Sequence, residues 1–265
     1  MLEDLKQKLV VIYSQPIMSV KNAVENVKPY EQGAEKKQQV SKMFNNISKR
    51  YDFLNHFFSL GIDRRWRRKA TAQLKEGQPK IILDIATGTG DLAIEVYKQL
   101  KPEKIVGIDI STGMLAVGRE KLDKKGLSTI ISLEEGDCEN LPFEDNSFDA
   151  IVVAFGVRNF ENVEKGLREM ARVLKPGGQC MILEFSRPKL FPLKQGFNLY
   201  FKYILPFIGR ITSKDKKAYS YLYESVQVFP EGKDFTELLE TAGLSNPKHT
   251  PMTMGICSAY WSEKL

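Results

Sequence analysis

Two glycines and a carboxylate are spaced in this chain as a small-ligand site requires. Gly88 and Gly90 end an apolar, β-branched run at residues 81–85 and precede residues at helical spacing. Glycine lets the backbone turn sharply and lets a ligand approach closely, and the start of a helix presents unpaired N–H groups. Asp109 ends the next apolar run about 20 residues later, where a carboxylate can accept hydrogen bonds from ribose hydroxyls. We therefore expect a ligand that carries a nucleoside.

The same Gly-x-Gly-x-x-Ala spacing also satisfies the fingerprint of a dinucleotide-binding turn, and a purely structural turn uses glycines as well. The charges around the turn distinguish these ligands. Asp84, Asp91 and Asp109 surround the glycines, and no arginine stands near them. Carboxylates attract a cation and repel a pyrophosphate. The turn therefore favours S-adenosylmethionine, whose sulfonium is positively charged, over NAD as the cofactor.

The elements that must position this turn alternate in type along the chain. Segments with apolar residues at helical spacing separate five strand-like runs, at residues 81–85, 105–110, 129–133, 148–155 and 180–185. This alternation predicts a doubly wound α/β fold, with a mostly parallel sheet covered by helices on both faces. Ligands of such sheets bind beyond the carboxyl ends of the strands. Asp109 and the pair Asp137-Cys138 follow the second and third runs, at that edge.

Three segments lie outside the alternation. Residues 1–34 carry no sustained pattern, and we expect a partly disordered N-terminal extension before one folded domain at 35–265. That domain begins with an amphipathic helix, because apolar residues recur there at steps of three and four. Residues 187–230 interrupt the strand–helix repeat with an aromatic helical segment, which we expect to form a cap over the site. A final helix and two β-like runs close the chain.

Composition limits the class of protein. The 265 residues are 42% hydrophobic and 27% charged, which is typical of a globular chain, and no apolar run approaches the roughly 18 residues of a membrane span. The three cysteines are widely spaced and indicate reduced thiols in a cytoplasmic protein; they are Cys138, Cys180 and Cys257. Because the chain has only two histidines, we expect no metal site.

The net charge of +6 favours an anionic partner, such as a membrane surface, a nucleic acid or an acidic metabolite. A predicted helix that runs to Leu74 carries a basic cluster, Arg64, Arg65, Arg67 and Arg68. The cluster fits the solvated face of a helix. It also fits contact with anionic lipid headgroups, where each base adds on the order of 1 kcal/mol. We expect no nucleic-acid partner, because the chain has no added RNA-binding module and no Asn-Pro-Pro-aromatic motif.

Several segments resemble a known family. Residues 82–91 (ILDIATGTGD) resemble motif I of class I S-adenosylmethionine-dependent methyltransferases, and residues 174–178 (LKPGG) resemble a later signature. Further matches are specific to the UbiE/MenG C-methyltransferases of quinone biosynthesis; they lie at residues 48–55 (SKRYDFLN), 155–159 (FGVRN), 183–188 (LEFSRP) and 219–225 (YSYLYES). The resemblance runs from about Val40 to Tyr260. It implies a Rossmann-like, seven-stranded methyltransferase domain whose last strand is antiparallel.

The resemblance also implies an activity. Family members transfer a methyl group from S-adenosylmethionine to a ring carbon of a prenylated quinol. The product is menaquinol, formed from demethylmenaquinol, or the corresponding benzoquinol of the ubiquinone route. The family's cofactor contacts correspond to Thr89, Asp109 and the Asp137-Cys138 pair, beside the turn that Gly88 and Gly90 form.

Catalysis needs a group that favours the ionised quinol, because an ionised oxygen donates electron density into the ring. Arg158 follows the fourth predicted strand, where a guanidinium could stabilise negative charge on that oxygen. Tyr51, on the N-terminal helix, could fold over the site and position the hydroxyl or a water. In the alternative interpretation, Arg158 pairs with a nearby carboxylate such as Glu161 and only shapes its loop.

The prenyl tail of such a substrate needs an apolar groove, which residues 197–208 could supply, and it keeps the substrate in a membrane. We therefore expect peripheral contact with the inner face of an anionic membrane through the basic cluster. A homodimer or a quinone-synthesis assembly is a further expectation. A non-catalytic scaffold that binds S-adenosylmethionine is the alternative outside the enzymes.

Overall fold

The computed structural model describes residues 24–30, 33–59, 61–204, 215 and 217–265. Residues 1–23 of the expected extension and residues 205–214 of the expected cap therefore lie outside the described residues. Within the part of the extension that is described, Val24 is buried in the core. The boundary at residue 34 stays a prediction.

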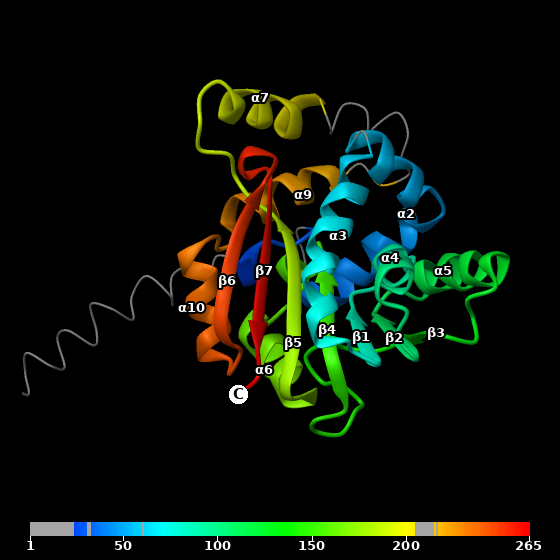
Figure 1. The fold of residues 1–265 in the computed structure, drawn as a ribbon. Coiled ribbons are helices and arrows are strands. Elements are labelled where there is room, and N and C mark those ends of the chain that lie inside the picture. The colour runs from blue at the N-terminus through cyan, green and yellow to red at the C-terminus, as the bar shows by residue number, and fades with distance from the viewer. Residues whose placement is uncertain (1–23, 31–32, 60, 205–214, 216) are drawn as a thin grey trace, which may run out of the picture.

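One seven-stranded sheet with the order β3-β2-β1-β4-β5-β7-β6 forms the centre of the fold (Figure 1). Strands β1 to β5 pair in parallel, whereas β7 pairs antiparallel with both of its neighbours. This confirms the predicted fold class. The strands are β1 (Ile81–Ile85), β2 (Lys104–Asp109), β3 (Ile131–Glu135), β4 (Phe148–Ala154), β5 (Leu174–Phe185), β6 (Ser245–Met252) and β7 (Cys257–Glu263).

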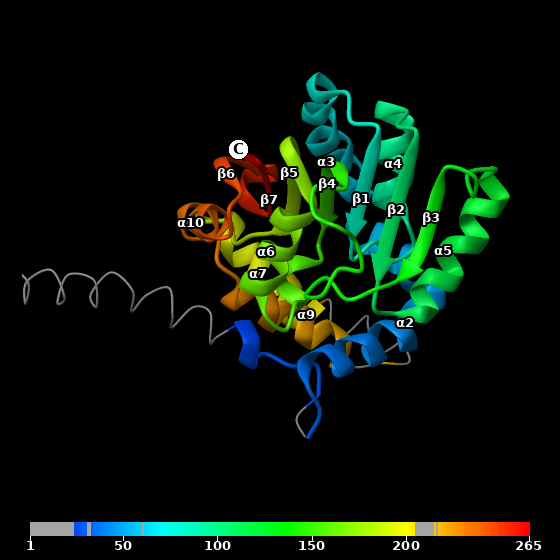
Figure 2. The ribbon, with the colours of Figure 1, turned by 90° about the horizontal axis from the view of Figure 1, so that it is seen from below.

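Helices cover both faces of the sheet, as Figure 2 shows from below. One face packs against α3 (Ile62–Thr71), α4 (Asp91–Leu100) and α5 (Thr112–Lys125) through a core that includes Trp66, Val96 and Leu115. The other face packs against α6 (Val163–Val173) and α10 (Lys233–Thr241). The central strands are buried on both faces, so nearly all of their residues are apolar. This is why the sequence alone could locate them.

A third group of helices lies across the carboxyl ends of the parallel strands. It comprises α2 (Lys36–Phe58), α7 (Leu193–Leu199), the π-helical turn η3 (Tyr200–Ile204) and α9 (Lys217–Val228). Their apolar side chains form a separate cluster that includes Val40, Met43, Phe197, Phe201 and Tyr221. The helical cap expected after the fifth strand is therefore present, and the N-terminal helix joins it.

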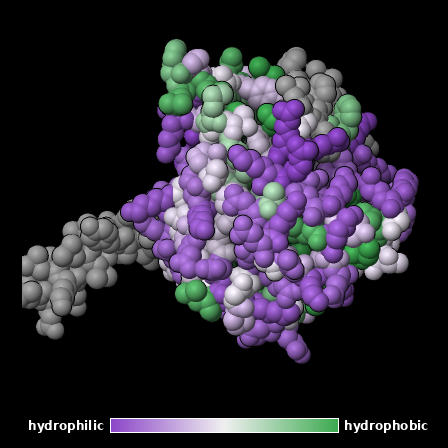
Figure 3. Space-filling model, in the orientation of Figure 1, coloured by the Kyte–Doolittle hydropathy of each residue, from purple (hydrophilic) through white to green (hydrophobic). Residues whose placement is uncertain are grey.

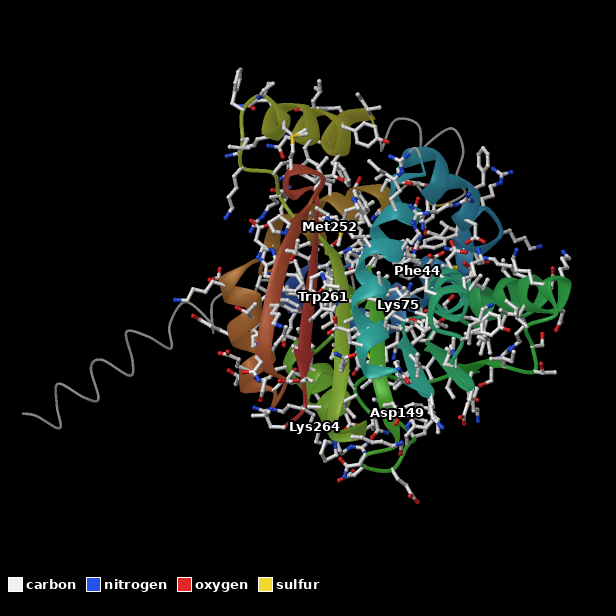
Figure 4. The ribbon with its side chains drawn as sticks, viewed as in Figure 1. Phe44, Lys75, Asp149, Met252, Trp261 and Lys264 are labelled. Atoms are coloured by element: carbon white, nitrogen blue, oxygen red, sulfur yellow. The ribbon has the colours of Figure 1, made fainter. Side chains whose placement is uncertain are left out.

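The two ends of the sheet differ. Figure 4 shows Asp149 and Lys264 at the amino ends of the parallel strands, with Met252 at the opposite end. Asp149 accepts hydrogen bonds from the backbone N–H groups of Lys80 and Ile81, and it pairs with Lys175 at 2.7 Å. Polar contacts thus close the amino end, and the carboxyl end is left for the site.

Local side-chain contacts define some element boundaries. Helix α5 has an N-cap, since the Ser111 side chain accepts a hydrogen bond from the N–H of Met114. Strand β5 begins at Leu174 rather than at residue 180 as expected, so the LKPGG segment is part of the strand. Gly177 adopts a φ of 75°, and its N–H bonds to the carbonyl of Lys264. A glycine in this conformation lets the segment join the sheet edge.

Candidate active site

Two cavities meet at the carboxyl ends of β1, β2 and β4. The smaller has a volume of about 70 Å³ and the larger about 370 Å³. Phe44, Tyr51, Phe155 and Asn159 line both. Phe155 directly follows β4 and has a φ of 60°, a backbone conformation that is costly for an aromatic residue and that often marks a functional site. A ligand in one cavity would therefore face a ligand in the other across these four side chains.

The smaller cavity brings together four of the expected cofactor-binding residues, Gly88, Asp109, Asp137 and Cys138. The Asp109 carboxylate accepts hydrogen bonds from the N–H groups of Gly88 and Ser111, each at 2.8 Å. Burial raises the pKa of Asp109 to about 6, although these two hydrogen bonds act in the opposite direction. The carboxylate is thus fixed in orientation, and it is ionised at neutral pH.

The remaining walls of the smaller cavity fit a nucleoside in character. Ile108, Met114 and Phe160 offer apolar surface for a base. The side-chain oxygen of Asn159 is buried and has no hydrogen-bond partner among the described residues. Together with Asp109 it supplies acceptors suited to a positively charged ligand, and the lysine in this wall, Lys37, is paired with Asp137 and Glu139. These residues therefore fit S-adenosylmethionine.

The cavity is too small for such a ligand as it stands, since cofactor sites occupy about 300–1,000 Å³. Helix α2 contributes Lys37, Val40 and Phe44 to its walls. The glycine turn and the strand ends are held by the sheet. A shift of these α2 side chains would widen the cavity for the cofactor.

Lys37 covers Asp137, which belongs to the Asp137-Cys138 pair that the family resemblance assigns to the cofactor. Its ammonium group lies 2.6 Å from Asp137 and 3.5 Å from Glu139. Asp137, Cys138 and Glu139 place possible metal-ligand atoms within 4.8 Å of one another, but the ammonium already neutralises the two carboxylates. Burial raises the pKa of the Cys138 thiol well above its usual value. Cys138 is therefore a neutral wall of the cavity.

Thr89 and Gly90, although described, are not among the residues that line either cavity. The Thr89 hydroxyl donates to Asp52 on α2 and accepts a hydrogen bond from Lys121 at 3.0 Å. Lys121 also pairs with Asp52 and Asp91. Thr89 thus fastens α2 to the glycine turn in this structure, and its contact with the cofactor stays a prediction.

The larger cavity is rich in aromatic side chains. Its walls include Trp66, Phe155, Phe185, Phe197 and Phe201. Polar side chains interrupt this surface, and four of them have a buried atom without a hydrogen-bond partner among the described residues; they are Arg67, Arg158, Asn159 and Tyr221. An apolar cavity with a few convergent polar groups is typical of a site for a largely apolar ligand.

Arg158 lies in this cavity with its side chain 7% exposed. Its partner is Glu184, at 2.9 Å, so the alternative interpretation is correct that Arg158 pairs with a carboxylate, but this carboxylate is not Glu161. The same Nη1 atom donates to the carbonyl of Phe155, while Nε is buried without a partner among the described residues. The guanidinium is therefore fixed by β5 in the wall of the larger cavity.

Tyr51 stands at the junction of the two cavities. Burial raises the pKa of its hydroxyl, and the positive charges of Arg158 and Arg67 act in the opposite direction. The hydroxyl therefore stays protonated at neutral pH, and it lies within electrostatic range of both guanidinium groups. The structure thus brings Tyr51 and Arg158 to one site, as expected.

Arg67 is in a different place from the one expected. Arg64, Arg65 and Arg68 are exposed, but Arg67 is buried and lines the larger cavity. Its Nη1 pairs with Asp63 one turn earlier on α3. The expectation that all four arginines face a membrane is therefore wrong for Arg67.

Sequence reasoning missed several residues of the site. Glu184 ends β5 as Asp109 ends β2, so the rule that ligands meet strand ends could have found it. Arg67 lies on the same face of α3 as Asp63, Trp66 and Ala70, which are all buried. The apolar residues of this face, Trp66 and Ala70, could have indicated that Arg67 is buried too. Lys37 shows no such signal, because it reaches Asp137 only through tertiary packing.

Comparison with known proteins identifies the group to which this architecture belongs. A demethylmenaquinone methyltransferase from Bacteroides fragilis is 50% identical over 240 residues, which cover 91% of this chain and 98% of the relative. The ubiquinone/menaquinone biosynthesis C-methyltransferase UbiE from Geobacter sulfurreducens is 43% identical over 231 residues, 87% of this chain and 90% of the relative.

Solved structures support the fold alone. The cyclase SpnF matches with a TM-score of 0.61 at 17% identity, over 86% of this chain and 96% of its own. A SAM-dependent methyltransferase from Aquifex aeolicus matches with a TM-score of 0.52 at 21% identity, over 72% of this chain and 85% of its own. The model of the ubiE/COQ5 methyltransferase family matches residues 32–264. The chain therefore belongs to the ubiE/COQ5 family of methyltransferases, with S-adenosylmethionine as the cofactor.

Proposed function

We propose that this enzyme methylates a ring carbon of a prenylated quinol, converting demethylmenaquinol to menaquinol. The observation that carries the proposal is the junction of two unlike cavities at Tyr51 and Phe155. The smaller carries the acceptors for a cationic nucleoside, and the larger is aromatic and apolar. The names of relatives such as the Bacteroides fragilis enzyme support the choice of quinol.

When bound, S-adenosylmethionine supplies an electrophilic methyl group on a sulfonium. Asp109 would hold the ribose hydroxyls, and the Asp137-Cys138 segment would lie at the base once Lys37 has moved away. The apolar walls around Phe155 exclude water, which strengthens every electrostatic interaction inside the site. The task of these residues is to align two reactants, since alignment supplies a large part of the rate enhancement.

Arg158 is suited to stabilise the quinol as it ionises. The guanidinium of Arg158 can donate to the oxygen beside the reacting carbon, and it favours negative charge there. Glu184 holds this group in place and balances its charge. Tyr51 can position the hydroxyl or a water that removes the proton displaced from the ring carbon. In this assignment Arg158 and Tyr51 are the catalytic residues.

The same geometry admits a second substrate, a polyprenyl benzoquinol of the ubiquinone route, because the name of the Geobacter sulfurreducens relative covers both quinones. An assay with labelled S-adenosylmethionine and both reduced rings tests the proposal. Labelled menaquinol as the main product supports it. Labelled benzoquinol alone would shift the substrate to the other route. Cofactor binding without transfer to either ring would indicate a scaffold.

We also propose that the enzyme visits a membrane surface to collect this substrate. No helix in the described ranges is long and apolar enough to cross a bilayer. Apolar side chains gather instead over α7, at the upper edge of Figure 3. Exposed large apolar side chains there are close in the chain to residues that line the larger cavity; they are Leu190, Phe191, Leu199, Tyr203 and Met254. Exposed apolar patches of this kind mark interaction sites.

The charge of residues 187–214, which include α7 and η3, favours contact with anionic lipid. Residues 187–214 contain six lysines and arginines but no aspartate or glutamate. Arg64, Arg65 and Arg68 of the expected basic cluster are also exposed. Helix α7 and η3 bury Phe197 and Phe201 on their inner side while Leu199 and Tyr203 are exposed. A helix that is apolar on more than one side suits the boundary between protein and lipid.

A further inference from the structure

The larger cavity contains a second guanidinium group that the proposed chemistry does not use. A 1,4-quinol has two oxygens on opposite sides of its ring, and Arg158 can address only the one beside the reacting carbon. We propose that Arg67, held by Asp63, binds the second oxygen, so that the cavity recognises a para-diol from both sides. This inference rests on the proposed quinol substrate and extends it to how the ring is chosen and oriented.

The surroundings of Arg67 point to a ligand. The side chain is only 9% exposed, and its partner Asp63 is 6% exposed. The Nε–H of Arg67 is buried with no hydrogen-bond partner in the described part of the chain. An unsatisfied buried donor on a charged group is destabilising. The Arg67 side chain lines the larger cavity, where a ligand with an acceptor atom would meet its guanidinium.

The ion pair with Asp63 does not by itself account for this placement. Arg64, Arg65 and Arg68 on the same helix are exposed, and an exposed arginine retains full hydration. A buried pair contributes little net stability, because removing two charges from water offsets their attraction. Asp63 also accepts a hydrogen bond from the hydroxyl of Ser59 at 2.6 Å. The pair is thus a fixed polar point in an apolar wall.

Arg67 and Arg158 occupy related positions around one aromatic pair. The Arg67 guanidinium lies 5.7 Å from the ring centre of Phe155, and that of Arg158 lies 5.4 Å from the ring centre of Phe185. The two rings are 4.6 Å apart and inclined at 32°. Both guanidinium groups act on Tyr51 at the cavity junction. Both guanidinium groups therefore lie beside the same aromatic pair in the wall of one cavity.

Two-sided recognition has a chemical consequence. A ring whose second oxygen carries a methyl group presents a shielded, weaker acceptor to Arg67, and such a mismatch discriminates between substrates. A quinone carbonyl accepts a hydrogen bond as a hydroxyl does, so Arg67 contributes binding and orientation while Arg158 acts on the oxygen that ionises. Arg67 is accordingly a specificity-determining residue for a ring with two free para oxygens.

The test pairs a change in the protein with a change in the substrate. We would compare a short-tailed, water-soluble 1,4-naphthoquinol with its monomethyl ether, in which the oxygen remote from the reacting carbon is blocked. The protein variants are Arg67→Met, which keeps the apolar stem, and Arg67→Lys, which keeps the charge. Lys69→Met, an exposed position on the same helix, is the matched control.

Loss of a hydrogen bond to a charged group corresponds to about 1.5–3 kcal/mol, or roughly 10- to 100-fold. We expect Arg67→Met to lower kcat/KM for the diol by that factor and to leave the monoether almost unchanged. Arg67→Lys should show the same pattern with a smaller loss, and Lys69→Met should behave as the wild type. Calorimetric binding of the diol should weaken in parallel, which separates binding from turnover.

Equal losses for the diol and the monoether would overturn the inference and make Arg67 a structural residue. An unchanged preference for the diol in Arg67→Met would also overturn it. If Arg67→Met does not fold, Arg67→Lys carries the comparison alone. A wild-type enzyme that binds S-adenosylmethionine but methylates neither ring would instead contradict the proposed function, and this outcome is distinct from the other two.

Discussion

Asp109 ties the backbone of the glycine turn to the start of α5, because its carboxylate accepts hydrogen bonds from both segments. We expect the same carboxylate to hold the ribose. Asp109→Ala should weaken cofactor binding by roughly 10- to 100-fold, the equivalent of a hydrogen bond to a charged group. Calorimetry on the folded variant checks this. An unchanged affinity would remove Asp109 from the cofactor site.

The ionisation of Asp109 gives a second test at the same residue. Burial raises its pKa to about 6, so the carboxylate becomes protonated as the pH falls through 6 and then accepts fewer hydrogen bonds. Cofactor affinity should therefore decline below pH 6 and level off above pH 7. Asp109→Asn cannot ionise and should bind weakly with little dependence on pH over this range. A wild-type affinity that stays constant from pH 5 to 7 would contradict the assignment.

Arg158 is positioned by Glu184 in the wall of the larger cavity. If its guanidinium stabilises the ionising quinol, Arg158→Gln should lower kcat by around 100-fold, as loss of an oxyanion-stabilising group does. Cofactor affinity should be unchanged, and the loss should shrink at higher pH, where the quinol ionises without help. Turnover and calorimetry together check this. A variant that loses stability in proportion to activity would assign Arg158 to the structure alone.

At the scale of elements, α2 is held to the rest of the molecule by a buried cation at its first turn. Lys36 is 1% exposed, and its ammonium group donates to the carbonyls of Val24 and Arg158. Burial lowers the pKa of Lys36 to about 8 from a usual value of 10.5. The start of α2 is thus linked to the loop that carries Arg158, at the cost of a buried charge.

This shifted pKa predicts how stability depends on pH. Between pH 8 and 10.5 the unfolded chain binds more protons than the folded one, so the contribution of Lys36 to stability rises with pH. This contribution is fully present above pH 10.5, the pKa of Lys36 in the unfolded chain, and it is lost as the pH falls through 8, its pKa in the folded chain. The change amounts to on the order of 3 kcal/mol. Urea unfolding of the wild type minus that of Lys36→Met, at pH 7 and 10, measures it.

The difference between wild type and Lys36→Met should thus favour the wild type more at the higher pH. Groups with raised pKa values, such as Tyr51, also make the free energy of unfolding depend on pH, and they lower it at high pH. This effect is the same in both proteins and cancels in the subtraction. A difference that does not change with pH would mean that Lys36 is hydrated. Lys69→Met, at an exposed site, should show no such dependence.

At the scale of the whole molecule, the exposed apolar surface beside α7 lies at one end and the C-terminus lies at the other. Phe191 is 80% exposed beside α7, and Leu265 is equally exposed at the end where Figure 4 shows Lys264. If the α7 end meets a bilayer, Phe191→Asp should weaken binding to anionic vesicles by roughly 10-fold or more, since burying such a side chain is worth about 1.5–3 kcal/mol. Leu265→Asp is the matched control.

Vesicle sedimentation at increasing salt tests both parts of this surface. Binding should fall as salt rises, because exposed charges are screened over about 10 Å at 0.1 M. Activity toward a short-tailed soluble quinol should be unchanged in Phe191→Asp. Equal vesicle binding by Phe191→Asp and the wild type would exclude this face. Loss of binding on neutralising Arg64, Arg65 and Arg68 alone would assign the contact to α3 instead.

The sequence by itself determined the order and type of the central elements. Buried parallel strands, amphipathic helices and the Ser111 cap depend on residues close together in the chain, so their patterns can be read directly. It also determined that Asp109 would meet the glycine turn, because the carboxyl ends of neighbouring parallel strands share one edge. These rules are local, or follow from topology alone.

Tertiary structure decided which side chains meet. Arg158 pairs with Glu184 rather than with Glu161, because β5 lies beside β4 in the sheet. Lys37 covers Asp137 because α2 packs across the strand ends, and Arg67 points inward because its stripe of α3 faces the core. Each contact joins residues whose separation in space depends on how whole elements dock. Charge alone favoured solvent for Arg67, and only the packing of α3 directs it to the larger cavity.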